Sequence, residues 1–440
     1  MNKKININII AHDGVTSHYT GVGRVIQDSL AVLADGQLLP FNYQVNALTG
    51  KYNKKCLGFN PELMQLSIDR LSLTGGKLYE CINGSLGEIS YGNIDHWQVA
   101  SVSAATTLKR MGELNRSSFN VNLCIDTPYA QVANYFTQYD DYRGAFVWIP
   151  HSTAKIHKID SAIKTRENYL QKRTEWEIKS VELANCNRSV FVGYISQYMK
   201  KHLLSEYGAD SATLVDFTNG LNLEDNRFRS GNMSQGKIRR ILVKHGISVE
   251  KPLLISFGRL EPYKGFEFTI KLGGLMAKKG LQTVLIAKPY TKNDPLVGEY
   301  KKLMKKFNPG GMFLYDYSFE SLPHAVMQWK NTKILLLPSL AEPFGLIPEE
   351  ARLYNRRDLA VVTSNKGGLA EQIKDRKDGF LLDIDDLDGS YKKLAQIGSL
   401  ARGTLAKMSR LGYQRVLQNY DLRRNLKRSI LNLLEKCEIE

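Results

Sequence analysis

The sequence predicts an α/β protein made of two Rossmann-like domains with parallel sheets. Strand-like apolar runs alternate with amphipathic segments of helical spacing along most of the chain, which is the pattern of repeated β-α units. The 440 residues are too many for one ordinary core, so two domains of roughly 200 residues each are expected. A polar, basic stretch at 230–252 ends in Pro252 and leads directly into a new strand–loop–helix unit, so we place the domain boundary there.

Short apolar runs mark the expected strands, and amphipathic segments mark the helices between them. The first strand covers residues 5–11, and the loop after it leads to a helix from Arg24 to Ala34. The last 50 residues are helical in pattern, so a terminal helix at 420–440 could pack back on the first domain. The predicted domains are residues 1–245 and 250–420. Later strands are expected at 121–125, 145–149, 189–193, 253–258, 283–287, 333–338, 359–363 and 380–383.

Composition excludes several classes of protein. Hydrophobic residues make up 43% of the chain and charged residues 24%, which is typical of globular proteins rather than of disordered or fibrous ones. No apolar run reaches the ~20 residues of a membrane helix, and the N-terminus lacks the long apolar stretch of a signal peptide. The five cysteines are scattered without a CxxC spacing, so neither a disulfide framework nor a zinc site is indicated. We therefore expect a cytoplasmic protein.

The chain carries a net charge of +16 at pH 7, which attracts anions such as nucleic acid, acidic lipid or phosphorylated substrates. Part of this charge lies in residues 155–201, which we call the basic segment. The basic segment can be a solvated helix face, or a surface that keeps the protein on an anionic membrane or near a charged acceptor. Its cations are Lys155, Lys158, Lys164, Arg166, Lys172, Arg173, Lys179, Arg188, Lys200 and Lys201.

The strongest chemical signal is the segment PSLAEPFGLIPEEARL at 338–353, which follows a very apolar strand. Ligands of open α/β sheets bind at the carboxyl ends of strands. Pro348 suits the start of a helix, so Glu342 is expected in the loop and Glu350 in the first helical turn. Two carboxylates placed in this way can bind two hydroxyl pairs, one on a sugar and one on a ribose. Complementing the helix dipole is an alternative that suits Glu349 and does not account for Glu342.

A second segment, LLISFGRLEPYKGFEFTI at 253–270, places two cations on a loop after a buried strand. Arg259 offers a planar fork of donors and Lys264 a point charge, and the two can converge on one anion. A diphosphate is a natural candidate for that anion. The alternative is a pair of solvated loop cations.

A third segment, SNKGGLAEQIKDRKDGFLLD at 364–383, places Gly367 and Gly368 just before an expected helix at 369–374. Glycines in this position let free backbone N–H groups approach a phosphate, and the helix dipole favours the negative charge. Glu371 falls in the first turn of that helix, where it can act as a capping residue.

These three motifs, in this order and spacing, resemble the carboxyl-terminal half of glycosyltransferase family 4, also known as glycosyl transferases group 1. Its members are retaining enzymes of the GT-B fold, in which two Rossmann-like domains face each other across a cleft. The resemblance covers about residues 250–385. It implies that Arg259 and Lys264 bind the donor diphosphate, and that Glu342 and Glu350 contact hydroxyls of the donor sugar and of the ribose. Further donor contacts are implied for Phe344, Gly345, Leu346, Gly367 and Gly368.

The amino-terminal half resembles the family more loosely. The segment TGVGRV at 20–25 is similar to the glycine-rich loop after the first strand, which implies that Gly21 and Gly23 approach the diphosphate from the other domain. A third glycine, which a dinucleotide fingerprint would contain, is absent. His151, in WIPHS, stands where the family has an active-site histidine near the donor sugar, although a histidine after an apolar strand is often structural.

The resemblance implies transfer of a sugar from a nucleotide donor to an acceptor hydroxyl, with retention at the anomeric carbon. Arg259, Lys264 and the helix start near Gly367 would stabilise the charge that develops on the departing diphosphate, so no metal or other cofactor is expected. Glu342 would orient the donor. A UDP-sugar is the favoured donor, and a glycan, lipid-linked or protein-linked hydroxyl is the expected acceptor. The setting would be assembly of bacterial surface polysaccharide, glycolipid or glycoprotein, with peripheral contact to an anionic membrane as a further possibility.

The sequence is also compatible with two alternative functions. Another GT-B enzyme would convert the donor without an acceptor if it were an epimerase, and would need free phosphate if it were a phosphorylase. A non-enzymatic protein that binds anionic surfaces would also account for the charge of +16. Nucleic acid is not an expected partner, because the sequence has no helix-turn-helix, zinc-finger or RNA-recognition signature. Residues 40–120 match no pattern that we can name, and AKPYT at 287–291 stands where the family often has a glycine-rich turn.

Overall fold

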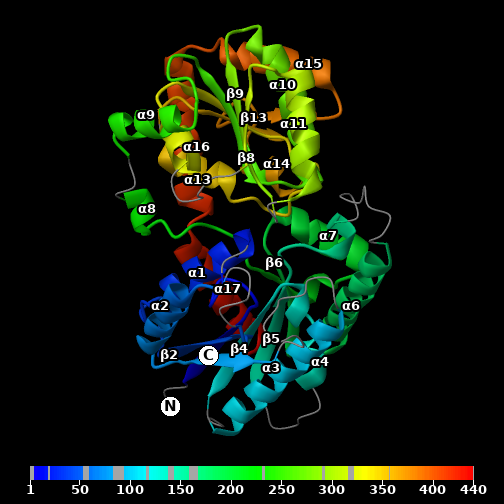
Figure 1. Cartoon of the computed structure of the whole chain (residues 1–440). Helices are drawn as coiled ribbons and strands as arrows, with labels where there is room; N and C mark the ends of the chain where they lie inside the picture. Colours follow the sequence, from blue (N-terminus) through cyan, green and yellow to red (C-terminus); the bar gives the residue numbers. More distant parts are fainter. Residues whose placement is uncertain are drawn as a thin grey trace. The chain divides into compact units, whose positions relative to one another are not determined.

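The chain folds into two compact units, seen in a computed structural model (Figure 1). The first unit holds Met1–Asn222 together with Tyr420–Glu440, and the second holds Leu223–Asn419. The division falls before the polar stretch at 230–252, because the helix inside that stretch packs on a helix of the second unit. The structure describes residues 4–17, 20–52, 59–82, 94–114, 118–136, 143–157, 167–229, 233–289, 293–315, 322–355 and 357–439.

The first unit is built on a parallel sheet of seven strands in the order β3-β2-β1-β4-β5-β6-β7. The strand order reverses between β1 and β4, and ligands of such sheets bind outside the carboxyl ends at that point. The strands are β1 (Ile5–Ile10), β2 (Tyr43–Gly50), β3 (Leu78–Cys81), β4 (Phe119–Ile125), β5 (Gly144–Ile149), β6 (Val190–Tyr194) and β7 (Leu214–Asp216).

The helices of the first unit form two packed groups, with α1, α2 and α17 in one and α3, α4, α5 and α6 in the other. They are α1 (Gly21–Leu33), α2 (Pro61–Ser72), α3 (Ile94–Leu114), α4 (Val132–Phe136), α5 (Ala154–His157), α6 (Glu167–Cys186), α7 (Gln197–Tyr207) and α17 (Leu422–Lys436). Short 3₁₀ turns at Thr127–Tyr129 and Ser211–Thr213 complete the described elements of this unit.

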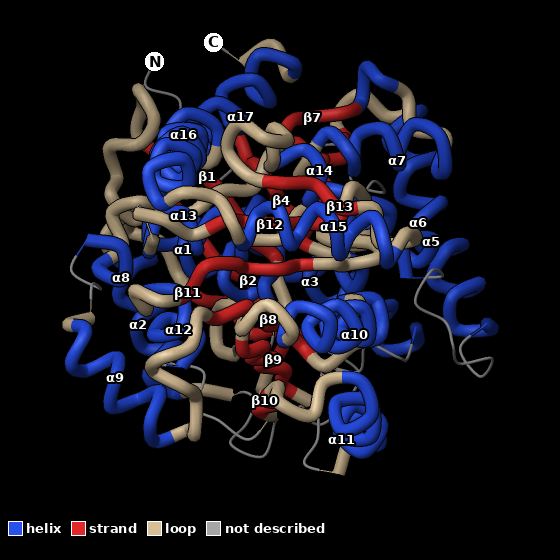
Figure 2. The backbone as a smooth tube through the Cα atoms, turned by 90° about the horizontal axis from the view of Figure 1, so that it is seen from above, coloured by secondary structure: helices blue, strands red, loops and turns tan. Residues whose placement is uncertain are grey.

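The second unit repeats this plan with a parallel sheet of six strands in the order β10-β9-β8-β11-β12-β13, which reverses between β8 and β11. Figure 2 shows the strands in red and the surrounding helices in blue. The strands are β8 (Leu253–Arg259), β9 (Gln282–Lys288), β10 (Met312–Leu314), β11 (Thr332–Leu337), β12 (Ala360–Ser364) and β13 (Phe380–Leu382). The helices are α8 (Asn226–Arg229), α9 (Gln235–Lys244), α10 (Phe266–Ala277), α11 (Pro295–Phe307), α12 (Leu322–Gln328), α13 (Ile347–Tyr354), α14 (Gly367–Gln372), α15 (Leu387–Gly398) and α16 (Arg402–Asn419).

A ladder of buried asparagines crosses the middle of the first sheet. Asn6 Nδ2 donates to Asn120 Oδ1 (3.0 Å), and Asn8 Nδ2 donates to Asn122 Oδ1 (2.9 Å) on the same neighbouring strand. On the other side, Asn46 Nδ2 donates to Asn8 Oδ1 (3.0 Å). A one-residue slip between strands would break these buried amide pairs, so the ladder fixes the register of β2, β1 and β4.

The chain leaves the first unit after Asn222 and returns at Tyr420, and the two crossing points are joined by hydrogen bonds. Leu221 N donates to Tyr420 O (2.9 Å), and Leu422 N donates to Leu221 O (3.1 Å). A Cβ atom on Gly220 would lie 2.5 Å from Tyr420 O, so glycine is required for this close approach. Helix α17, which follows the second crossing, packs against α1 and β7.

The predicted strands occur in the structure, but four further strands were not predicted. Strands β2 and β3 lie in the region 40–120 that the sequence left uninterpreted, and β7 and β10 have only three residues each. The first helix begins at Gly21 rather than Arg24, because Thr20 caps it by accepting a hydrogen bond from Val22 N (3.1 Å). Gly21 and Gly23 therefore belong to a helical turn and not to a loop.

The basic segment is not one continuous surface. Arg173 is buried and forms an ion pair with Glu177 on the same helix (2.7 Å), so it adds nothing to a surface patch. Lys172, Lys179, Arg188 and Lys201 are exposed. Lys155 and Lys200 are half-buried, and Lys158, Lys164 and Arg166 lie outside the described residues.

Candidate active site

The second sheet brings the predicted cation loop and the predicted carboxylate loop together where its strand order reverses. Arg259 ends β8, and Lys264 ends the short turn after it. Glu342 lies in the loop after β11, and its carboxylate forms an ion pair with the ammonium of Lys264. Gly265 makes this possible: its φ is +67°, and a Cβ atom there would lie 2.1 Å from Pro338 O of the carboxylate loop.

The Lys264–Glu342 pair is shielded from water, with side chains only 13% and 14% exposed. Burial by itself lowers the pKa of Lys264, but the neighbouring carboxylate outweighs this effect, so the net pKa is raised and the ammonium stays charged at neutral pH. Arg259 Nη2 donates to the hydroxyl of Tyr263 (3.0 Å), whose ring also lies 4.9 Å from Lys264 Nζ. Arg259 and Lys264 thus both contact Tyr263, which keeps the two cations close together.

The predicted glycines Gly367 and Gly368 begin α14 and pack against the carboxylate loop. A Cβ atom on Gly367, whose φ is +60°, would lie 2.6 Å from Glu342 O, and one on Gly368 would lie 2.3 Å from Pro343 O. Gly368 N donates to Glu342 O (2.7 Å). The expectation that both N–H groups are free for a phosphate is therefore wrong for Gly368, because the protein itself uses this donor.

The segment Phe344–Leu346 is placed by the other end of α14. Gln372 Nε2 donates to Phe344 O (2.6 Å) and to Gly345 O (2.9 Å), and Gly345 has a φ of +84°. The side chain of Phe344 is buried, so only its backbone can reach a ligand. Both carbonyl groups therefore have a partner inside the protein, which orients the peptide groups of this segment.

The two adjacent glutamates of α13 have different surroundings. The carboxylate of Glu350 lies 3.7 Å from Arg227 Nη1 and is partly exposed, to about the same degree as that of Glu342. Glu349 is completely buried and pairs with Arg352 (3.3 Å), which also pairs with Asp378 (3.1 Å). Burial raises the pKa of Glu349 to about 7, against the opposing charge of Arg352. Glu349 is thus a core residue, and the helix-dipole explanation is incomplete for it.

The first unit has its own polar cluster at the point where its strand order reverses. His12 and Asp13 follow β1, Asp126 follows β4, and His151 follows β5, which are neighbouring strands. Asp13 organises the turn into α1, because Gly14 N donates to its Oδ1 (2.9 Å) while its Oδ2 accepts from Thr20 N (2.9 Å) and Thr20 Oγ1 (2.8 Å). Sequence reasoning predicted only His151 in this cluster.

His151 lines a small cavity between the sheet, α1 and α17, with mainly apolar neighbours such as Ile125 and Ile149. Burial lowers the pKa of His151 to about 4, and burial together with His151 lowers that of His12 to about 3. Both imidazoles are therefore neutral at pH 7 and suited to hydrogen bonds with hydroxyls. The other predicted residues nearby, Gly21 and Gly23, lie in the first turn of α1.

Asp126 is the most unusual residue of this cluster. Its φ is +64°, a left-handed conformation that costs a residue other than glycine about 1–3 kcal/mol. It is 6% exposed, and burial raises the pKa of its carboxyl to about 6 while Arg173 opposes the shift. Its Oδ1 atom accepts no hydrogen bond from the described residues. An aspartate directly after an apolar strand was the only sequence signal for it.

Within the described ranges, no group of three or more His, Cys, Asp and Glu side chains is arranged to bind a metal ion. Among the described helices, none combines the length and the hydropathy needed to cross a bilayer.

Several solved structures share this architecture, among them a synthase and a protein in complex with UDP-glucose. The fold is similar to that of a sucrose-phosphate synthase from Thermosynechococcus elongatus, with a TM-score of 0.71, 15% identity and coverage of 98% and 99% of the two chains. It is also similar to Anabaena HepE in complex with UDP-glucose, with a TM-score of 0.65, 16% identity and coverage of 98% and 99%. A trehalose synthase from Pyrococcus horikoshii is 24% identical over 276 residues, which are 60% of this chain and 61% of the relative's length.

The two parallel-sheet units and their similarity to these solved structures give the chain the GT-B fold. Residues 237–415, which include Arg259, Lys264, Glu342 and Glu350, match the family model described as glycosyl transferases group 1.

Proposed function

We propose that this protein transfers a hexosyl group from a UDP-sugar to an acceptor hydroxyl, with retention of configuration at the anomeric carbon. The observation that carries the proposal is the contact between Lys264 and Glu342, which joins the cation loop after β8 to the carboxylate loop after β11. A cation for the diphosphate and a carboxylate for the sugar hydroxyls are thereby adjacent, and these two parts of a nucleotide sugar are bonded directly to each other. The choice of UDP is supported by the complexes of Anabaena HepE with UDP-glucose and of an Escherichia coli protein with UDP-2-fluoro glucose.

In the proposed reaction, the bond between the anomeric carbon and the diphosphate oxygen breaks, and the acceptor oxygen bonds to that carbon from the same face. Negative charge accumulates on the departing diphosphate, where Arg259 and Lys264 stabilise it by fixed electrostatics. The leaving phosphate takes the proton of the acceptor hydroxyl. Glu342 orients the sugar through its hydroxyls and forms no covalent bond. Since two cations face the diphosphate, we expect that the transfer needs no divalent metal ion.

Donor binding would exchange the partners of the Lys264–Glu342 pair. The diphosphate would pair with the ammonium of Lys264, and the sugar hydroxyls would donate hydrogen bonds to the carboxylate of Glu342. Glu350 would bind the ribose, and the backbone of Phe344, Gly345, Leu346 and Gly367 would line the sugar and phosphate. Gly21 and Gly23 of the first unit remain predicted donor contacts, and His151 remains the predicted catalytic histidine near the donor sugar. A glycan, lipid-linked or protein-linked hydroxyl is the proposed acceptor, in bacterial surface polysaccharide, glycolipid or glycoprotein assembly, in the cytoplasm or at the inner face of the membrane.

The test is a thermal-shift panel with UDP, GDP, ADP and CMP in the presence of EDTA. A ligand at about 100 times its Kd stabilises the folded state by about 2.7 kcal/mol, which raises Tm by a few degrees. We expect UDP to shift the wild type and not R259A/K264A. The matched control is K271A/K278A, which removes two cations from α10 and the residue after it and should keep the shift. If none of the nucleotides raises the Tm of the wild type, the proposal is wrong.

Product analysis separates the alternatives of the same fold. A transferase consumes UDP-glucose only when an acceptor is present, whereas an epimerase converts it alone and a phosphorylase requires free phosphate. A purely anionic-surface binder would consume none. The buried position of Arg173 weakens this last alternative, since part of the basic segment is then not available to a surface.

A further inference from the structure

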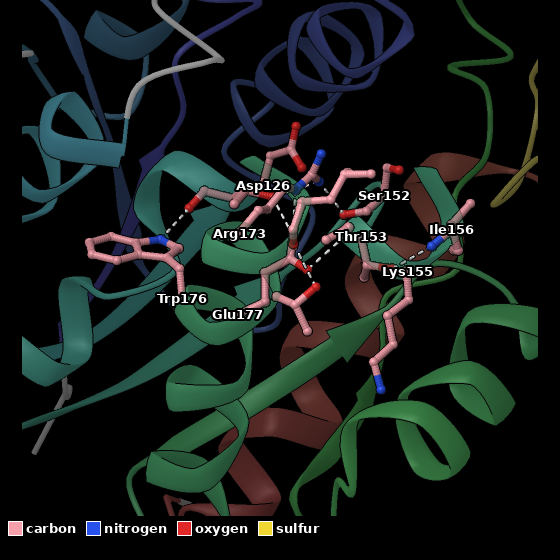
Figure 3. A network of polar contacts seen from close by, with 12 residues as sticks. Asp126, Ser152, Thr153, Lys155, Ile156, Arg173, Trp176 and Glu177 are labelled. Carbon is pink, nitrogen blue, oxygen red and sulfur yellow. Dashed lines mark hydrogen bonds and ion pairs between the residues drawn. The ribbon is translucent and has the colours of Figure 1, made fainter. Parts of the chain in front are cut away.

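A fully buried ion pair on α6 contacts both segments that carry the unusual polar groups of the first unit. Figure 3 shows this network, in which Arg173 and Glu177 lie between the turn after β4 and the turn after β5. Arg173 is 6% exposed and Glu177 is completely buried. The pair does more than join two turns of one helix, because its partners include Thr127 and Ser152, which directly follow Asp126 and His151.

Each carboxylate oxygen of Glu177 binds one of the two segments. Its Oε1 accepts from the hydroxyl of Thr127 (2.9 Å), the residue after Asp126, and its Oε2 accepts from Ala154 N (2.9 Å), three residues after His151. Oε2 also accepts from the hydroxyl of Tyr207 (2.6 Å). Glu177 is therefore a bridge with partners on both sides.

Arg173 also connects the turn after β4 to the turn after β5. Its Nε donates to Glu177 Oε1 (2.7 Å), while its Nη2 donates to Thr127 Oγ1 (2.8 Å) and to Ser152 O (3.1 Å). Ser152 is the residue after His151. The forked guanidinium thus fixes a side chain of one turn and a carbonyl group of the other at the same time.

The backbone at Asp126 is constrained from further sides. Trp148 Nε1 donates to Asp126 O (3.2 Å), Asp126 N donates to Ile149 O (2.9 Å), and Trp176 Nε1 donates to Thr127 O (3.0 Å). Trp176 precedes Glu177 on α6. A left-handed residue other than glycine persists only where its surroundings over-determine it, and this network provides that constraint.

We propose that Arg173 and Glu177 are positioning residues of the transferase, which hold Asp126 and His151 in one fixed arrangement at the carboxyl edge of the first sheet. The proposal rests on the proposed function, because the benefit of this arrangement is catalytic. Both residues act through the turns that they hold and not by contact with substrate. Replacing a buried ion pair often leaves stability unchanged, so a purely structural pair could be exchanged without loss of turnover.

The experiment uses the full chain with E177Q, which removes the charge and one acceptor, and R173K, which keeps the charge and loses the fork. The matched control is N6A, which breaks a buried hydrogen bond of the same sheet at the opposite, amino end of β1. For both network variants, we expect kcat with UDP-glucose to fall by about tenfold or more, while the donor KM and the Kd of UDP stay within about twofold. N6A should lose stability and keep kcat.

A spectroscopic measurement tests positioning independently of activity. The imidazole resonance of His151, assigned by comparison with H151N, should move in E177Q and R173K, and stay in place in N6A. If either network variant folds and keeps both the resonance and kcat of the wild type, the proposal is overturned. If the wild type binds no UDP, the proposed function fails, and the His151 resonance still decides whether the network positions that ring. Should E177Q fail to fold, R173K decides the question alone.

Discussion

Gly21 and Gly23 lie two residues apart in the first turn of α1, yet their surroundings differ. A Cβ atom on Gly23 would lie 2.6 Å from the carboxylate of Asp13, which organises the preceding turn. A Cβ atom on Gly21 would meet nothing within 4 Å. Packing within the unit thus explains Gly23 and gives no reason for Gly21, so ligand approach by Gly21 stays a prediction.

We therefore expect opposite results from two alanine substitutions. G23A should lower the free energy of unfolding by about 1–3 kcal/mol, because the Asp13 turn must shift. G21A should leave the chain as stable as the wild type or more stable by about 0.5–1 kcal/mol, because alanine suits a helix better than glycine. The donor KM of G21A should nevertheless rise. Urea unfolding and donor-saturation kinetics check both statements, and an unchanged KM in G21A would show that Gly21 does not approach the donor.

Glu349 and Glu350 allow a second test at the scale of single residues. Burial raises the pKa of Glu349 from its usual 4.5 to about 7, so between these values the folded chain holds a proton that the unfolded chain has lost. The contribution of this carboxyl to stability accordingly falls as pH rises from about 4.5 to 7, by at most about 3 kcal/mol.

E349Q removes this titration, so its Tm relative to the wild type should increase between pH 5 and pH 8. Its donor KM should stay near that of the wild type, because Glu349 faces the core. E350Q, which removes the carboxylate proposed to bind the ribose, should instead give a several-fold higher donor KM. Thermal scans across this pH range and kinetics at one pH distinguish the two residues. Equal kinetic losses in both variants would contradict the assignment.

At the scale of elements, the asparagine ladder of the first sheet determines how β1 pairs with β4. In N6L the Asn120 Oδ1 atom loses its donor from β1, and in N120L the Asn6 Nδ2 atom loses its acceptor. Each single variant should cost about 1–3 kcal/mol, since a buried polar group is left unsatisfied. The N6L/N120L double variant should lose less free energy of unfolding than the two single variants lose together. A double-mutant cycle by urea unfolding measures this coupling, and strict additivity would show that the pair does not act as a unit.

The same ladder shows why part of the fold could not be predicted from the sequence. Asn46 interrupts the apolar pattern of β2, and only its hydrogen bond to Asn8 on the partner strand β1 makes this amide compatible with burial. The strands before Arg259 and Glu342 were predictable, because they contain long apolar runs and lead into polar loops. Arg173 and Glu177 have the i, i+4 spacing of a surface ion pair, so their burial becomes evident only when β4 and β5 are in place. Asp126 became a candidate only through its positive φ angle, which the sequence does not show.

At the scale of the whole molecule, the chain is two units with separate sheets and separate cores. The core of the second unit includes apolar clusters around Leu254, Ile334 and Val362, and around Phe266 and Leu285. All four charged residues proposed to bind the donor, Arg259, Lys264, Glu342 and Glu350, lie within this unit. Helix α17 belongs to the first unit, where it packs against α1 and β7.

We therefore expect residues 223–419 to fold on their own and to bind UDP with a Kd within about tenfold of that of the full chain, which corresponds to about 1.4 kcal/mol. They should not transfer sugar, because the polar cluster of the first unit is missing. Isothermal titration with UDP measures the affinity, and the same shortened chain with K264A is the control that should not bind. If the shortened chain is folded by circular dichroism and yet binds UDP a hundredfold more weakly, the donor site needs residues of the first unit, and the contacts predicted for Gly21, Gly23 and His151 gain weight over those of the second sheet.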